Sequence, residues 1–213
     1  MLQKSPAKKP QPAAYKDIPV DLHRIGIKFF AGEGNSAALV DFIPVFHRWI
    51  QNKSLEQLLL IDVADYSHVE RGPGTVLVAH EGNLSIDETG GRRGLAYYSK
   101  HELPGQLKDC LETVAVNALK ACCLLEKGET VNTKISFPGN ELQIFSNDRL
   151  LAPNTEKTWS QLEPAIRGFL EKLYSGQDYS IERERDPGER FQVTVKVPEA
   201  VAVDTLLQRI SNE

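Results

Sequence analysis

The order of short alternating segments and long amphipathic segments constrains the fold of this chain more than any other feature of its sequence. From residue 75 onward, short segments in which apolar and polar residues alternate meet in pairs at turns rich in glycine, and a longer segment follows each pair. The longer segments carry apolar residues three or four positions apart. Alternation predicts strands and the wider spacing predicts helices, so the sequence predicts three successive β-β-α units.

Each predicted hairpin has a three-residue turn that contains glycine. Such turns favour a tight reversal of the chain, and two strands joined in this way are antiparallel. The turns are Thr89-Gly90-Gly91, Pro138-Gly139-Asn140 and Asp186-Pro187-Gly188, between strands predicted at residues 83–88 and 93–99, 133–137 and 141–145, and 179–184 and 190–197. The helices predicted to follow span residues 104–126, 155–173 and 201–210, and a further strand is predicted at residues 75–79.

The first third of the chain has a different order. Alternation near residues 20–29 predicts a strand, and apolar residues from Leu39 to Ile50 at spacings of three and four predict a helix. Leu58–Val63 is apolar at nearly every position, which is typical of a strand covered on both faces. The predicted fold class is α+β: a largely antiparallel sheet with helices mainly on one face, an N-terminal β-α-β unit and three β-β-α units.

Residues 1–19 differ from the remainder of the chain. They carry four prolines and four lysines, Lys4, Lys8, Lys9 and Lys16, against a single acidic residue, Asp17. This composition predicts a disordered basic tail, and a tether to an anionic surface is the functional alternative. Residues 20–213 are predicted to form one α+β domain, in which residues 127–132 are the only candidate for a subdomain boundary.

The charge of the chain argues against one class of partner. The net charge is −4, and because residues 1–19 carry +3, residues 20–213 carry −7. Proteins that bind nucleic acids need a basic surface to neutralise phosphates, so we expect no nucleic-acid partner. No apolar run reaches the ~18 residues of a membrane-spanning helix, and no signal peptide is visible.

Three cysteines, Cys110, Cys122 and Cys123, fall within one predicted helix. An odd number of cysteines, two of which are adjacent in the sequence, suits neither a disulfide framework nor the spacing of metal ligands. Reduced thiols are typical of the cytosol, so we expect a cytoplasmic protein.

Two turns form the leading candidate for a ligand site. The first lies between the first strand and the first helix, where backbone amides favour an anion, and the second follows the Leu58–Val63 strand. If the two strands are parallel, both turns lie at the same edge of the sheet. The structural alternative is that the polar side chains bond neighbouring backbone amides and only shape the loops. The candidate residues are Gly32, Gly34, Ser36, Asp62, Asp65, His68 and Arg71.

Two further groups of residues have side chains suited to binding. Arg48 and Trp49 on the first helix are candidates for contact with a partner, although a tryptophan packed over the sheet explains the same pattern. His80 is expected about 15–20 Å from His68, too far to share a metal ion. We expect neither a metal nor a cofactor, and no residue is predicted to be catalytic.

The sequence contains no nucleophile elbow and no metalloprotease motif. We therefore favour a non-catalytic adaptor or chaperone-like protein that binds another protein or a second copy of itself. The alternative is a small enzyme, or a protein that binds a small molecule or metal, using the Asp62–Arg71 loop and the Gly32–Ser36 turn. The adaptor hypothesis predicts an exposed apolar patch, and the alternative predicts that the two turns share one concave pocket.

Overall fold

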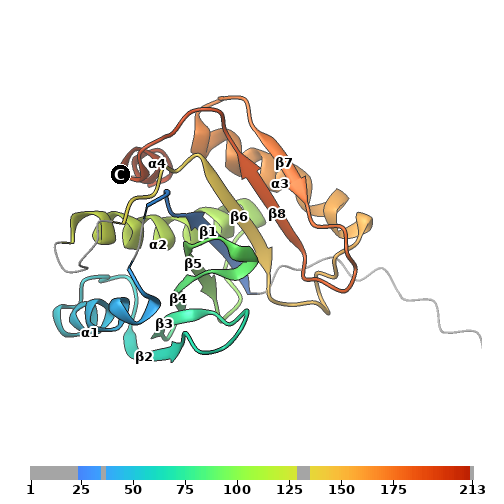
Figure 1. Cartoon of the computed structure of the whole chain (residues 1–213). Coiled ribbons are helices and arrows are strands. Elements are labelled where there is room, and N and C mark those ends of the chain that lie inside the picture. Colours follow the sequence, from blue (N-terminus) through green and yellow to red (C-terminus); the bar gives the residue numbers. More distant parts are fainter. Residues whose placement is uncertain (1–23, 35–36, 129–134, 212–213) are drawn as a thin grey trace, which may run out of the picture.

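Eight strands form one continuous antiparallel sheet in the order β2-β3-β4-β5-β1-β6-β8-β7 (Figure 1). This computed structural model describes residues 24–34, 37–128 and 135–211, so the tail predicted at residues 1–19 lies outside it. The strands are β1 (Ile25–Phe30), β2 (Leu60–Tyr66), β3 (Gly74–Ala79), β4 (Gly82–Asp87), β5 (Gly94–Ser99), β6 (Glu141–Ser146), β7 (Ser180–Arg183) and β8 (Gln192–Lys196). The helices are η1 (Leu39–Phe42), α1 (Ile43–Asn52), η2 (Thr89–Gly91), α2 (Leu107–Lys127), α3 (Glu156–Tyr174) and α4 (Val203–Ile210).

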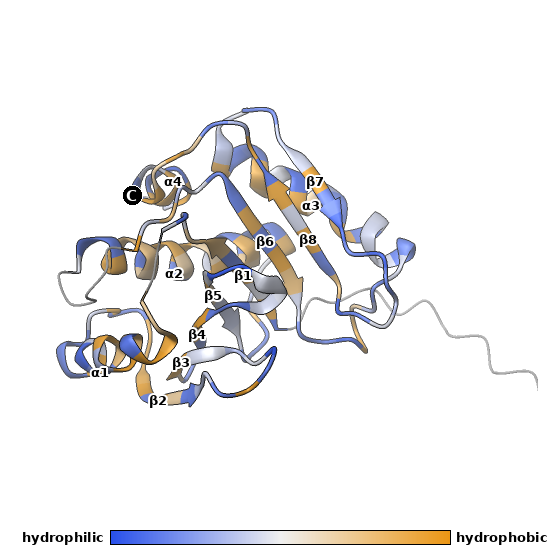
Figure 2. Cartoon of the chain, in the orientation of Figure 1, coloured by the Kyte–Doolittle hydropathy of each residue, from blue (hydrophilic) through white to orange (hydrophobic). Residues whose placement is uncertain are grey.

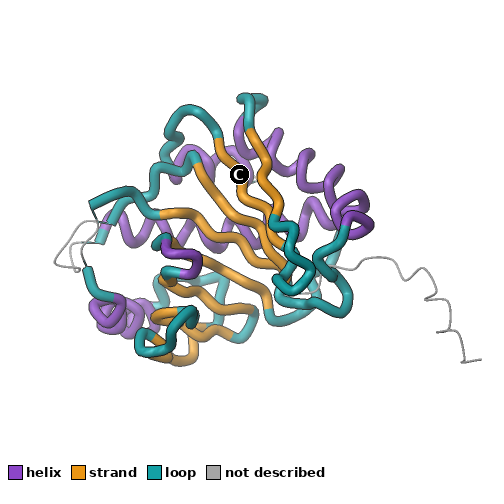
Figure 3. Tube along the Cα trace, turned by 45° about the vertical axis from the view of Figure 1, so that its right-hand side comes forward, coloured by secondary structure: helices purple, strands orange, loops and turns teal. Residues whose placement is uncertain are grey.

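Helices cover one face of the sheet. α2 contacts β1 and β5, and α3 and α4 both pack against α2. Figure 3 shows α2 and α3 behind the strands, with the opposite face of the sheet toward the viewer. We call these two sides the helix face and the open face. The predicted α+β class, with a largely antiparallel sheet, is therefore confirmed.

Alternation along β1 shows how the sequence produces the two faces. Ile27 and Phe29 are fully buried and belong to the core cluster beneath the helices. Lys28 lies between them and, because successive side chains of a strand point to opposite sides, it points to the open face. The core continues without interruption from α1 to α4, since Phe46, Leu119 and Leu206 belong to the same cluster.

The position of β2 differs from the prediction. Four antiparallel pairings separate β1 from β2, so the two strands run in the same direction, but β3, β4 and β5 lie between them. β2 is an edge strand, and the side chain of Ile61 is 55% exposed. The prediction of a strand covered on both faces was therefore wrong. Leu58 packs into the core, but Leu59 and Ile61 are exposed. All three residues are apolar, so the sequence alone does not distinguish the buried one from the exposed ones.

The segment before β6 also differs from the prediction. Part of the strand predicted at residues 133–137 lies outside the described residues, and residues 135–138 form no strand. Ile135 and Phe137 alternate because both side chains are buried in the core. The backbone there bonds elsewhere: Gly32 N donates to Ser136 O at 2.8 Å, and Phe137 N donates to the carboxylate of Glu126 at 2.7 Å.

Within the described residues, no helix has both the length and the apolar character that crossing a bilayer requires.

Candidate functional sites

A buried ion pair lies at the centre of the open face. Lys28 donates from Nζ to the carboxylate of Asp87 and to the carbonyl oxygen of Arg92, the latter at 2.8 Å. Both side chains are buried, and burial lowers the pKa of Lys28 while the charge of Asp87 opposes that shift. A third, longer bond goes to the carbonyl of Thr89. Lys28 therefore ties the β4–β5 turn, residues 88–93, to the sheet.

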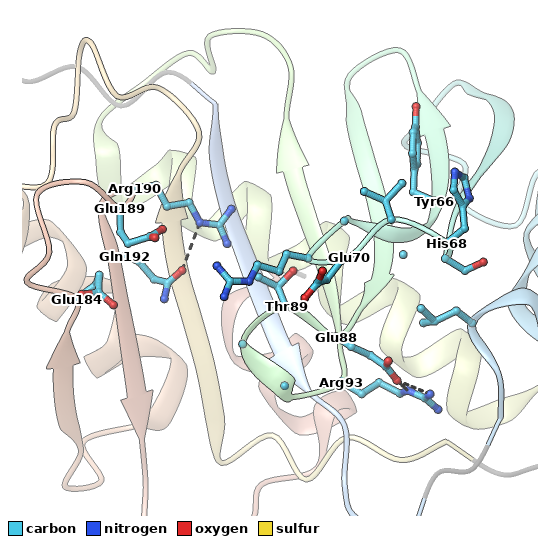
Figure 4. Close-up of a pocket in the computed structure, with 18 residues that line it drawn as sticks. Tyr66, His68, Glu70, Glu88, Thr89, Arg93, Glu184, Glu189, Arg190 and Gln192 are labelled. Atoms are coloured by element: carbon cyan, nitrogen blue, oxygen red, sulfur yellow. Dashed lines mark hydrogen bonds and ion pairs between the residues drawn. The ribbon is translucent and has the colours of Figure 1, made fainter.

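A cavity of about 1040 Å³ opens beside this turn, and we call it the open-face cavity (Figure 4). Residues from three connections line it: the β2–β3 loop (67–73), the β4–β5 turn and the β7–β8 turn (184–191). Because β2 and β7 are the opposite edges of the sheet, the sheet must twist and curl strongly for their loops to meet. Figure 4 shows Tyr66 and His68 on one side of the cavity and Glu184, Glu189, Arg190 and Gln192 on the other.

Three contacts fix Arg190 against the sheet. The carbon of its guanidinium lies 3.8 Å from the centroid of the Phe145 ring. Nε donates to Gln192 Oε1 at 3.3 Å, and Nη1 donates to Asn147 Oδ1 at 3.0 Å. Phe145 lies over Gly26, where a Cβ atom would overlap the ring. Glycine at this position of β1 thus permits the stack that positions Arg190.

The β2–β3 loop brings two predicted site residues, His68 and Arg71, to the same cavity. Asp65 accepts a bond from the amide of Ser67 at 2.8 Å, and hydrogen bonds from Ser67 lower the pKa of its carboxyl group. Arg71 has a φ of 59°, in the left-handed region that residues with a Cβ rarely adopt. A strained backbone at a cavity wall is more common where a side chain has a role in binding.

The other predicted ligand residues do not line this cavity. Gly32 bonds the carbonyl of Ser136, Gly34 is exposed, and Ser36 lies outside the described residues. Asp62 accepts a bond from the amide of the next residue at 2.8 Å. Asp62 and Asp65 thus shape the local backbone, and neither they nor Gly32 and Gly34, the described glycines of the first turn, line the cavity.

Arg190 was not among the predicted site residues, although its sequence carries a signal. Polar and apolar residues alternate through β8 and the residues before it, which places Arg190 on the face opposite the buried valines. The alternating sets are Arg190, Gln192 and Thr194, and Phe191, Val193 and Val195. What the sequence lacks is any sign that this face meets the β2–β3 loop.

The candidates on α1 lie in different environments. Trp49 is only 7% exposed and packs against Phe46, with ring centroids 5.3 Å apart. Arg48 is exposed. Of the two explanations for this pair, the packed tryptophan is the one that the structure supports.

His80 neighbours His101, with ring centroids 5.2 Å apart, and it follows β3 at the end of that strand opposite the β2–β3 loop, which carries His68. Throughout residues 24–34, 37–128 and 135–211, no group of three or more histidine, cysteine or acidic side chains is placed to hold an ion.

A second candidate surface is apolar and surrounds the free edge of β2. Six large apolar side chains are exposed among the described residues, and four of them lie in β2 or within three residues of it along the chain. Figure 2 shows hydrophobic positions along β2 at the free rim of the sheet. We call this set the β2 edge surface: Leu59, Ile61, Tyr66 and Val69. The other two are Val40, in η1, and Leu150, in the β6–α3 connection.

The two edges of the sheet are not equivalent. β7 has four residues, and its sequence continues with alternating charges from Glu182 to Arg185, a pattern that opposes pairing with another strand. β2 has seven residues, with an irregular register between Leu60 and Asp62. β2 is therefore the longer and more apolar edge.

The chain matches no protein-family model, no curated protein and no solved structure.

Proposed function

We propose that this protein is a non-catalytic, cytoplasmic adaptor or chaperone-like protein that binds a partner protein along the β2 edge surface. The observation that carries the proposal is the gathering of four exposed apolar side chains at or next to one free strand edge. Contiguous apolar surface of this kind marks sites of protein contact. An unpaired edge also offers backbone groups to an extended segment, which is how strand addition recognises peptides.

The charges at this edge favour a basic partner segment. Asp62 and Asp65 are exposed, and neither forms an ion pair with a described residue. Asp62 currently bonds the amide of Val63. A lysine or arginine of the partner would attract Asp62 and free that amide for pairing with the incoming strand. The proposed partner segment is therefore extended and apolar, with at least one basic residue.

The same charges disfavour a second copy of this chain as the occupant. Antiparallel pairing of β2 with itself would bring two copies of Asp62 and Asp65 into one two-stranded interface. Like charges opposite one another across strands are destabilising. A homodimer through β2 is thus the weaker alternative.

The buried cysteines support the cytoplasmic part of the proposal. All three of their side chains are buried in α2. Burial raises the pKa of the Cys122 thiol, which keeps it protonated and slow to oxidise. Such thiols are typical of proteins that function in a reducing compartment.

A photo-crosslinking experiment tests the proposal. A benzophenone amino acid placed at position 61, or at position 150 as the control, is irradiated in cells that express the full chain. Both positions carry exposed apolar residues, Ile61 and Leu150, but only Ile61 lies at the β2 edge. We expect position 61 to capture a partner through an extended segment that contains a lysine or arginine.

The captured segment is then titrated as a pure peptide. Ile61→Lys removes apolar contact and adds a repelling charge, so it should weaken binding by about 10-fold or more, whereas Leu150→Lys should not. Capture of a second copy of the chain would favour the homodimer. Equal capture at both positions would show that β2 has no special role.

A further inference from the structure

Arg190 is a half-buried cation that has no ion-pair partner among the described residues. Its hydrogen bonds go to the neutral side-chain oxygens of Gln192 and Asn147, and its guanidinium stacks on Phe145. A guanidinium has five N–H groups, and these bonds use two of them. Removing a cation from water without an opposite charge is unfavourable, so this arrangement indicates a place for an anion.

Three other arginines near this cavity each have an ion-pair partner, which Arg190 lacks. The pairs are Arg92 with Glu141, Arg93 with Glu88 and Arg183 with Glu156. Burial lowers the pKa of Arg190, and the nearby charges of Asp87 and Glu189 raise it without making contact. The environment of Arg190 is therefore incompletely neutralised by the protein itself.

Arg71 lines the same cavity from the β2–β3 loop. It is exposed and has no ion-pair partner among the described residues. The loop that carries it is held by bonds between Val69 N and Tyr66 O and between Gly72 N and Val69 O, both 2.9 Å long. Two arginines, from loops at opposite edges of the sheet, thus line one cavity.

None of the four glutamates of the cavity forms an ion pair with Arg71 or Arg190. Glu88 pairs with Arg93, and Glu184 accepts bonds from two neighbouring backbone amides at 2.8 and 2.9 Å. Glu70 and Glu189 are exposed and form no ion pair with a described residue. These two carboxylates can accept hydrogen bonds from hydroxyl or amino groups of a ligand.

We propose that the open-face cavity binds a small phosphorylated molecule, with its phosphate between the guanidinium groups of Arg71 and Arg190. The planar fork of arginine matches the oxygens of a phosphate. The cavity volume of about 1040 Å³ leaves room for a sugar or nucleoside beside the phosphate. Glu70 and Glu189 then accept bonds from the hydroxyl groups of that sugar. This site adjoins the β2 edge surface, because Tyr66 and Val69 belong to both, but phosphate binding by the two arginines does not require the proposed partner.

Titration calorimetry and phosphorus NMR of the full chain at low ionic strength test the proposal. The probes are inorganic phosphate, ribose 5-phosphate and adenosine 5′-monophosphate, with ribose and adenosine as uncharged controls. We expect the phosphorylated probes to bind and the uncharged controls not to. Equal affinity for all three phosphates would identify free phosphate as the ligand. Tighter binding of an ester would identify an organic phosphate.

Three variants separate the site from general surface charge. Arg190→Gln and Arg71→Gln should each weaken phosphate binding by about 10- to 100-fold, because each removes charge-assisted hydrogen bonds. Arg185→Gln removes an exposed arginine of the same turn that does not line the cavity, and it should bind like the wild type.

Arg71 lies in an exposed loop, so its variant remains decisive if Arg190→Gln fails to fold. Absence of binding for every phosphate probe would overturn the proposal. An equal loss in Arg185→Gln would do so as well, because it would show that only the overall surface charge matters.

Discussion

Lys28 and Asp87 show how one buried charge depends on another. Asp87→Asn would leave Lys28 buried without its counter-charge, so we expect the free energy of unfolding to fall by about 3–5 kcal/mol in urea titrations. Glu163→Gln is the matched control, because Glu163 pairs with Arg167 on the surface of α3. Its loss should be about 0.5 kcal/mol. Equal effects of the two substitutions would show that the Lys28–Asp87 pair contributes no more than a surface pair.

Tyr97 gives the protein a predicted pH dependence. Burial raises the pKa of its hydroxyl group from 10.0 to about 12, with a smaller contribution from the charge of Glu81. Between these values the folded protein keeps a proton that the unfolded chain has lost, so the contribution of Tyr97 to stability is complete below pH 10 and is lost as the pH rises toward 12. We expect the free energy of unfolding, measured by urea titration from pH 9 to 11.5, to fall less steeply in Tyr97→Phe.

Tyr66→Phe is the control for that comparison, since it removes an exposed phenol on β2. A Tyr97→Phe profile that follows the wild type throughout this range would contradict a role for the buried hydroxyl.

At the scale of elements, Trp49 anchors α1 to the core, so its side chain is not exposed for contact with a partner. Trp49→Ala should lower the free energy of unfolding by about 3–5 kcal/mol, because it leaves a large cavity next to Phe46. Arg48→Ala changes an exposed neighbour and should stay within about 0.5 kcal/mol of the wild type. Chemical denaturation of both variants checks this. A small effect of Trp49→Ala would place the side chain outside the core in solution.

Elements whose form depends on local signals were predictable from the sequence. Glycines at positions 90 and 91 adopt positive φ values and close the β4–β5 hairpin where the turn was predicted. α3 begins after Thr155, whose hydroxyl accepts a bond from the amide of Thr158, close to the predicted start. The edge position of β2 was not predictable, because the order of strands in a sheet depends on pairings between distant residues.

The candidate site was predictable only in part for the same reason. The sequence indicated His68 and Arg71 because their loop follows a strand, at the edge of the sheet where ligands are often bound. Arg190 is 119 positions further along the chain than Arg71, and the two line one cavity only because the sheet curls from β2 to β7. No local pattern encodes that curvature, so the convergence of the two arginines is visible only in the folded protein.

At the scale of the whole molecule, the sheet and the core both cross the predicted subdomain boundary near residues 127–132. β1 from the first part of the chain pairs with β6 from the second, and α2 packs against both α3 and α4. Residues from both parts belong to one core cluster. A boundary in the sequence therefore does not correspond to a gap in packing between the described segments.

This continuity predicts that the two parts unfold together. The chain has two tryptophans, Trp49 in α1 and Trp159 in α3, so each part carries its own fluorescent reporter. In Trp159→Phe the fluorescence reports the first part, in Trp49→Phe it reports the second, and circular dichroism reports both. Because neither part can expose its side of the shared core without exposing the other, each fluorescence midpoint in urea should coincide with the circular dichroism midpoint of the same variant. Separated midpoints within one variant would instead establish residues 127–132 as a true subdomain boundary.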